Sequence, residues 1–184
     1  MIRNPLQLAA SAGAALAVLA ASSAAAQEPD LETRLVAINA SLEGVWEGQV
    51  VRIDPATGTA NIYQDVIALE VISPDGLDFA YERGGQRVLY DHLEDGLHQV
   101  KAWSGERLIA DVPVRFLDVV GPDAAGSWSH AEEYVFAAPD GTETEHRNEY
   151  AFENGVWSSS QYERPAGAET EFALAGSASY ARAD

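Results

Sequence analysis

The chain has 184 residues, with 29 acidic and 11 basic side chains and a formal net charge of −18. Such an excess of negative charge argues against binding to nucleic acid or to an anionic membrane surface. The chain has no cysteine, which excludes disulfides and thiol chemistry and leaves the burial of apolar side chains to stabilise the fold.

The first residues have the pattern of an export signal. Arg3 precedes an Ala-rich apolar run that ends at Ala24-Ala25-Ala26. This pattern predicts a signal peptide over 1–26, cleaved after Ala26, and therefore a periplasmic or secreted protein. A membrane anchor is the alternative, but the run is short and Ala-rich for a membrane span. No later segment is apolar enough to cross a membrane. The remaining residues, 27–184, have the length of one domain with a hydrophobic core.

The next segment predicts one short helix followed only by strands. Over 30–42, Asp30 can cap the helix, and Leu31, Leu35, Ile38 and Leu42 share one face. From Gly44 onward, polar and apolar residues alternate between closely spaced turn signals. Ten strands are predicted, at 45–53, 60–73, 77–83, 86–93, 97–103, 107–117, 126–137, 142–153, 156–164 and 169–180.

This succession predicts an all-β fold. Short hairpin links make neighbouring strands antiparallel. Closing the tenth strand on the first would remove exposed edges, so we expect a ten-stranded up-and-down (meander) barrel after the short helix. A two-sheet sandwich is the alternative.

Turn types predict the strand registers. A three-residue turn ending at Gly141 and a type I′ turn at Asn154-Gly155 set the registers of the seventh, eighth and ninth predicted strands. On the predicted inner face, four rows result: Trp128/Phe152/Trp157, His130/Tyr150/Ser159, Glu132/Asn148/Gln161 and Tyr134/His146/Glu163. Turns at Gly76 and Gly85 add Phe79, Tyr81, Arg83 and Tyr90 to the lining. The preferred register after Tyr90 places His92 opposite His98 and points Lys101 outward, so that all four histidines face inward.

Three of the four tryptophans follow a glycine by two positions. They are Trp46 after Gly44, Trp128 after Gly126 and Trp157 after Gly155. Each begins an odd-numbered strand, and such strands run the same way in a meander. The three indoles should therefore form an aromatic floor at one barrel end, with each glycine allowing the chain to bend. If the last strand pairs with the first, Arg182 lies over Trp46 as a cation–π partner.

The helix, the opening Gly44-Val45-Trp46-Glu47-Gly48 and the basic Arg182 near the end of the last strand resemble the calycin group, which includes lipocalins and fatty-acid-binding proteins. The resemblance covers about 42–182 and implies a ligand-binding barrel. The ten strands depart from the eight of lipocalins and are nearer to fatty-acid-binding or nitrobindin-like barrels, and the Gly-x-Trp-x-Gly resembles nitrobindin-like proteins. No position in the last strand matches the haem-ligating histidine of those proteins, which makes haem doubtful, and the sequence requires no other cofactor.

The predicted interior is unusually polar, and this points to a small-molecule ligand. Polar groups are costly to bury unless they are paired or solvated, so the alternative is a self-satisfied polar network. The principal hypothesis is a carrier for a small amphipathic or acidic ligand. Its predicted contacts are Arg52, Phe79, Tyr81, Arg83, Trp128, His130, Glu132, Tyr134, His146, Asn148, Tyr150, Gln161 and Glu163. Within this set, Arg52 and Arg83 could hold a carboxylate, or instead reach solvent or pair with Glu163.

Other functions use subsets of the same residues. His130, Glu132 and His146 could bind a transition metal. His130, Glu132 and Tyr150 could perform acid–base catalysis, but the sequence has no nucleophile elbow, P-loop or dinucleotide motif, and we do not expect an enzyme. A surface that binds a partner protein is a further possibility, with Trp103, Leu89 and Ile109 as the apolar residues expected outside. The sequence identifies no such partner.

Overall fold

A computed structural model describes residues 29–138 and 140–183. The predicted signal peptide, 1–26, lies outside the described residues. The structure contains one helix, α1 (Leu31–Leu42). Its ten strands are β1 (Gly44–Ile53), β2 (Ala60–Val71), β3 (Phe79–Arg83), β4 (Gln86–Glu94), β5 (Leu97–Ser104), β6 (Arg107–Val120), β7 (Trp128–Ala137), β8 (Glu143–Glu153), β9 (Val156–Pro165) and β10 (Ala173–Arg182).

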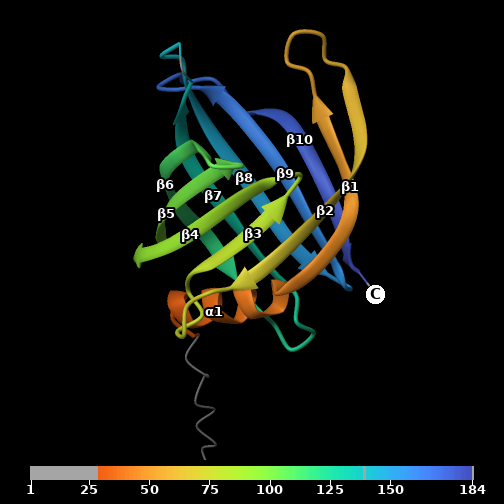
Figure 1. Cartoon of the computed structure of the whole chain (residues 1–184), viewed down its shortest axis with the longest axis vertical. Helices are drawn as coiled ribbons and strands as arrows, with labels where there is room; N and C mark the ends of the chain where they lie inside the picture. Colours follow the sequence, from red (N-terminus) through yellow and green to blue (C-terminus); the bar gives the residue numbers. More distant parts are fainter. Residues whose placement is uncertain (1–28, 139, 184) are drawn as a thin grey trace, which may run out of the picture.

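The ten strands form a closed antiparallel barrel in which each strand pairs with its neighbours in sequence. β1 completes the barrel by pairing with both β2 and β10. Helix α1 lies across one end of the barrel, and the β1–β2 hairpin extends at the other end (Figure 1). The predicted all-β meander barrel is confirmed, and the sandwich alternative is wrong. Among the described residues, no helix is long and apolar enough to cross a membrane.

The predicted registers of β7, β8 and β9 are confirmed. Phe152 pairs with Trp128 on one side and with Trp157 on the other. Asn154 and Gly155 both have positive φ, at 53° and 80°, as a type I′ turn requires. Pro139, in the turn before Gly141, lies outside the described residues. The preferred register of the β4–β5 hairpin, with His92 opposite His98, is also confirmed.

The prediction for β10 is wrong at its start. The strand begins at Ala173 rather than 169, and its register shifts between Leu174 and Gly176. Such a bulge inserts one residue and reverses the face that preceding side chains occupy. Strict alternation from Phe172 through Leu174 to Tyr180 and Arg182 would place all four side chains inside. Leu174 is instead 46% exposed, and the ring of Phe172 contacts the guanidinium of Arg164.

A second bulge lies at Ile109. The register of β5 against β6 shifts between Ala102 and Trp103, which pairs with Leu108, so Ile109 has no paired residue. Ile109 was expected outside and is 36% exposed, but it also lines the barrel cavity. An unpaired bulge residue departs from the strict alternation of faces, which accounts for this double exposure.

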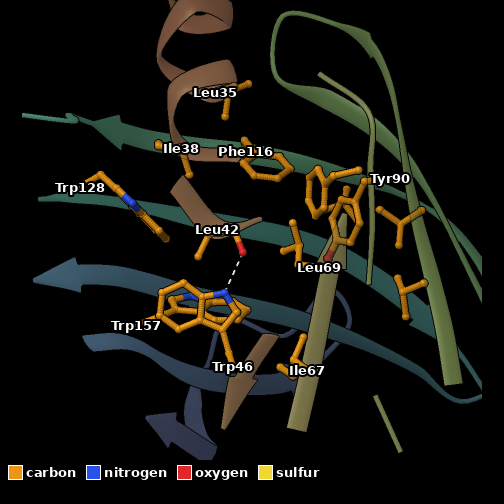
Figure 2. Close-up of a cluster of buried hydrophobic side chains, with 14 of the residues drawn as sticks. Leu35, Ile38, Leu42, Trp46, Ile67, Leu69, Tyr90, Phe116, Trp128 and Trp157 are labelled. Carbon is orange, nitrogen blue, oxygen red and sulfur yellow. Dashed lines mark hydrogen bonds between the residues drawn. The ribbon is translucent and has the colours of Figure 1, made fainter. Parts of the chain in front are cut away.

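The predicted aromatic floor is present, and α1 seals it (Figure 2). The Trp46 ring lies 5.9 Å from that of Trp157 and 6.0 Å from that of Phe152, both edge-on. The indole nitrogen of Trp46 donates a 2.7 Å hydrogen bond to the carbonyl of Leu42, the last helical residue. Leu35, Ile38 and Leu42 of the helix are buried against this cluster. The apolar face of α1 therefore closes the barrel end that the tryptophans line.

Arg182 fixes the junction between the helix and the barrel. Its guanidinium carbon lies 4.7 Å from the centre of the Trp46 ring, the cation–π contact expected from the sequence. The same group donates hydrogen bonds to the carbonyls of Glu43 at 2.6 Å and Ser41 at 2.8 Å. Ser41 lies in the last turn of α1 and Glu43 is its C-cap, where backbone acceptors lack helical partners. Arg182 thus joins the end of β10 to the end of α1.

The two glycines of the opening motif have separate structural roles. Gly44 has a φ of +127°, and a Cβ there would lie 2.7 Å from a guanidinium nitrogen of Arg182. Gly48 instead makes room for Tyr180, because a Cβ would lie 2.5 Å from the Tyr180 ring and 2.1 Å from the carbonyl oxygen of Ser179. The motif therefore permits close packing of β1 against β10.

Candidate functional site

The barrel encloses a cavity of about 420 Å³ above the aromatic floor. One side of its lining is apolar and comes mainly from β2–β6. The apolar residues there include Leu69, Phe79, Val88, Val100, Val114 and Phe116. The opposite side comes from β7, β8 and β9 and is polar. We call this second side the polar wall and define it as His130, Glu132, His146, Asn148, Tyr150, Ser159 and Gln161.

Strand pairing explains why the polar wall is continuous. Glu132 of β7 pairs with Asn148 of β8, which pairs with Gln161 of β9. Gln161 pairs with Gly176, and Gly176 pairs with Arg52 of β1. Directly paired residues point to the same face of a sheet, so these side chains form one belt at one level of the barrel. Gly176 leaves a gap in this belt, and the Arg52 side chain passes over it.

Glu132 is the most deeply buried member of the polar wall, with 3% of its surface exposed. Its Oε2 accepts hydrogen bonds from the hydroxyl groups of Tyr90 at 3.4 Å and Tyr150 at 3.3 Å. The ring nitrogen Nε2 of His130 lies 3.7 Å from the other oxygen, Oε1. The three residues of the acid–base hypothesis, His130, Glu132 and Tyr150, are therefore brought together. A carboxylate with neutral donors on one oxygen can accept a proton or a hydrogen bond on the other.

The tyrosines around Glu132 are held in their neutral form. Burial raises the pKa of both Tyr90 and Tyr150 well above the ordinary value, and the negative charge of Glu132 raises it further. Burial and Glu132 likewise raise the pKa of Tyr134 to about 12. Ionising any of these hydroxyls would place a second negative charge beside a buried carboxylate. They therefore act as hydrogen-bond donors.

The mouth of the cavity carries a different set of charges. The Nδ1 of His146 lies 3.4 Å from a carboxylate oxygen of Glu163, and its ring stacks on that of Tyr134 with centres 4.8 Å apart. Burial lowers the pKa of His146; Glu163 opposes the shift and Arg52 adds to it. Arg52 is exposed, and among the described residues no carboxylate lies within ion-pair distance of it. It is therefore the cation available at the mouth.

Arg83 has a partner that the sequence did not suggest. Its Nε lies 2.5 Å from Oδ2 of Asp65 in β2, and the Tyr180 hydroxyl donates a 2.8 Å hydrogen bond to the same oxygen. Arg83 thus pairs with Asp65 rather than with Glu163. Asp65 lies opposite Gly48, which in turn pairs with Tyr180. The register that pairs Ile67 with Arg83 could have pointed to this group, because Asp65 lies two positions from Ile67 on the same face.

The four histidines do not form one group. His130 and His146 line the cavity, whereas His92 and His98 do not. His98 lies beside Phe116, with ring centres 4.6 Å apart, and neither of its buried ring nitrogens forms a hydrogen bond of good geometry within the described part of the chain, although the backbone of Leu77 and Gly96 lies nearby. Burial, together with the neighbouring His92, lowers the pKa of His98 to about 4. His98 therefore behaves as a neutral aromatic core residue.

Most of the predicted contact residues line the cavity, and two do not. Trp128 is covered by α1, where its indole nitrogen donates a 2.9 Å hydrogen bond to Ser41 Oγ. Glu163 lies beyond the lining, beside His146. The sequence missed several lining residues. These are the helix residues Ile38, Asn39 and Leu42 and the apolar Val100, Val112, Val114 and Phe116 of β5 and β6.

The metal hypothesis gains no support from the geometry. His146 pairs with Tyr134, two positions along β7 from Glu132, and its imidazole contacts Glu163 instead of Glu132. In the described part of the chain, no three His, Cys, Asp or Glu side chains are grouped so that they could hold a metal ion.

Comparisons with protein-family models, curated proteins and solved structures found no match for this chain.

Proposed function

We propose that the barrel binds a small amphipathic molecule in its interior. The observation that carries this proposal is the cavity of about 420 Å³ with an apolar side facing a polar wall. Small-molecule sites in proteins typically measure roughly 300–1,000 Å³ and combine an apolar lining with a few polar groups. A closed barrel is also a rigid frame for such a site, because its polar groups are mounted on strands rather than on loops.

The lining suggests how the ligand is oriented. Its apolar body lies against the side that contains Phe79, Val100 and Val114, where contact removes apolar surface from water. Its polar group faces Asn148 and Glu132 of the polar wall. An acidic ligand would depend on Arg52 at the mouth, because Asp65 already neutralises Arg83. Of the two arginines predicted to hold a ligand carboxylate, only Arg52 is therefore left.

We also propose that the protein is an exported relative of the calycin group. The support is the closed meander barrel, the short helix before the opening Gly44-Val45-Trp46, and the contact of Arg182 with that tryptophan. Export rests on the signal-like pattern of 1–26. Expression of the full chain, followed by N-terminal sequencing of the mature protein, tests export directly; an uncleaved N-terminus would contradict it.

The binding proposal is tested by filling the cavity. Ala102 lines it, whereas Ala68 is an exposed strand residue. The Ala102→Trp variant should lose most binding of prodan, a neutral amphipathic fluorophore, because the indole occupies the space of the ligand. The matched variant Ala68→Trp should bind prodan as the native protein does. Fluorescence titration measures both, and circular dichroism verifies the fold. Equal binding by the two variants, or no binding by the native protein, would contradict an interior site.

A further inference from the structure

The charge state of the polar wall points to the chemistry of the ligand. Glu132 is the one carboxylate among the described residues that line the cavity. Only 4% of its side-chain surface is exposed. Removing an ionised carboxylate from water is costly unless a positive charge or several strong hydrogen bonds compensate for it. The partners of Glu132 therefore decide what the site lacks.

The protein's own partners compensate for this charge only in part. Both tyrosine hydroxyls donate to Oε2, at 3.3 and 3.4 Å, which is long for an O–H···O⁻ hydrogen bond. Oε1 accepts no hydrogen bond within the described residues. No lysine or arginine in that part of the chain lies within 4.0 Å of Glu132, and His130 approaches to 3.7 Å. Thus Oε1 is an unused acceptor on the cavity lining.

Aromatic residues pack beside Glu132. The hydroxyl groups of Tyr90 and Tyr150 point at its Oε2. The ring of His130 lies 4.9 Å from that of Tyr150 and 4.9 Å from that of Phe116, between centres. Attraction between opposite charges is strongest where such groups exclude water. A carboxylate with an open oxygen in this setting is suited to a positively charged hydrogen-bond donor.

The wider electrostatics favour the same ligand class. The chain carries a formal net charge of −18, which raises the local concentration of cations and lowers that of anions. A ligand carboxylate placed at the polar wall would face Glu132 across a site of low dielectric constant and be repelled. An ammonium group would supply the positive charge that Glu132 lacks.

We propose that Glu132 recognises a protonated amine, so that the ligand is a small organic cation with an apolar body. This inference rests on the proposed interior binding site and specifies its substrate class. The ammonium group donates to Oε1, and the apolar body lies against the β2–β6 side. Tyr90 and Tyr150 hold the carboxylate in position from the other oxygen.

Three probes of nearly equal size test this inference at neutral pH: 2-phenylethylamine, 2-phenylethanol and phenylacetate. In titration calorimetry, the native protein should bind the amine roughly tenfold or more tightly than the alcohol, because a charge-assisted hydrogen bond replaces a neutral one. Phenylacetate should bind most weakly. Glu132→Gln should remove the preference for the amine and retain binding of the alcohol. Glu132→Asp should keep a reduced preference and shows whether charge or side-chain length is responsible.

The control separates recognition from general attraction. Glu70→Gln changes the net charge equally at an exposed residue of β2, and it should keep the full preference for the amine. Equal losses in the Glu70 and Glu132 variants would overturn the inference. If the alcohol binds and Ala102→Trp blocks it, but the amine binds no better, the amine inference fails and the interior site stands. Tighter binding of phenylacetate would overturn it in favour of Arg52, and no binding of any probe would overturn both proposals.

Discussion

The aromatic floor and the polar wall share strands β7, β8 and β9, yet their polar atoms differ in how they are hydrogen-bonded. At the floor, the indole nitrogens of Trp46 and Trp128 donate hydrogen bonds of 2.7 and 2.9 Å to residues of α1. At the polar wall, the hydrogen bonds to Glu132 are 3.3 and 3.4 Å long, and Nδ1 of His130 has no hydrogen-bond partner among the described residues. Trp157 belongs to the floor but lines the cavity, and its indole nitrogen likewise lacks a hydrogen-bond partner in the described part of the chain.

This difference separates scaffold from site. Buried polar groups in stable cores are nearly all hydrogen-bonded, so each exception calls for an explanation. Trp46 and Trp128, which contact α1, follow the rule and need only a structural explanation, whereas Trp157, which lines the cavity, does not follow it. The polar wall departs from it within two residues along β7, from Trp128 to His130. Residues that are retained despite an energetic cost are typical of binding sites, where stability is exchanged for function.

The floor should be the most sensitive part of the fold. Trp46 is 1% exposed, and Trp46→Ala removes a large buried side chain and the hydrogen bond to α1. We expect the free energy of unfolding to fall by about 3–5 kcal/mol. Urea unfolding followed by far-UV circular dichroism measures the loss. Trp103→Ala is the matched control, because Trp103 is only half-buried, and it should cost less than about 1 kcal/mol. Similar losses of unfolding free energy in the two variants would show that the aromatic floor is not the most sensitive part of the fold.

A second prediction tests the unpartnered interior through pH. The pKa of His98 is about 4, below the ordinary value of 6.5. Between these values the unfolded chain binds a proton that the folded chain does not, so stability falls as pH drops from about 6.5 to 4 and is unaffected above that window. The two pKa values imply a loss of about 3 kcal/mol.

Replacing the ring nitrogens isolates this effect. His98→Phe keeps an aromatic ring among Phe79, Tyr90 and Phe116 and cannot be protonated. The variant should lose much less stability than the native protein between pH 6.5 and pH 4.5, measured by urea unfolding at each pH. His146→Phe should leave most of the pH dependence in place, because His146 is only half-buried and lies beside Glu163. An unchanged slope in His98→Phe would show that His98 is solvated or paired.

The strand order and the floor could be predicted from sequence because turns are local. Asn154-Gly155 has one favoured hairpin geometry, which fixes the pairing of β8 with β9 through to Glu163. The polar wall followed from the same registers, since a register assigns every side chain to one face. This is why the sequence alone could place His130, Glu132 and Asn148 together on the inner face.

The features that were missed depend on geometry that single strands do not encode. The bulge between Leu174 and Gly176 inserts one residue, and a count by twos along the strand does not register it, so the start of β10 was placed on the wrong face. Asp65 lies among polar neighbours in β2, and its hydrogen bond from Tyr180 depends on how closely β1 and β10 approach at Gly48. The contribution of α1 to the cavity lining was missed because helix placement over a barrel depends on tertiary packing.

The smallest expected effect has the opposite sign, and it is the sharpest test of the comparison. Without ligand, Glu132→Gln should raise the free energy of unfolding by about 1 kcal/mol, since a buried charge is removed while the amide oxygen still accepts from Tyr90 and Tyr150. Urea unfolding at neutral pH measures the change. Glu145→Gln is the control, because Glu145 pairs with Arg164 on the outer surface at 2.5 Å, and it should lose a little stability. If Glu132→Gln instead unfolded as readily as Trp46→Ala, the carboxylate would be part of the scaffold, and the distinction between floor and polar wall would fail.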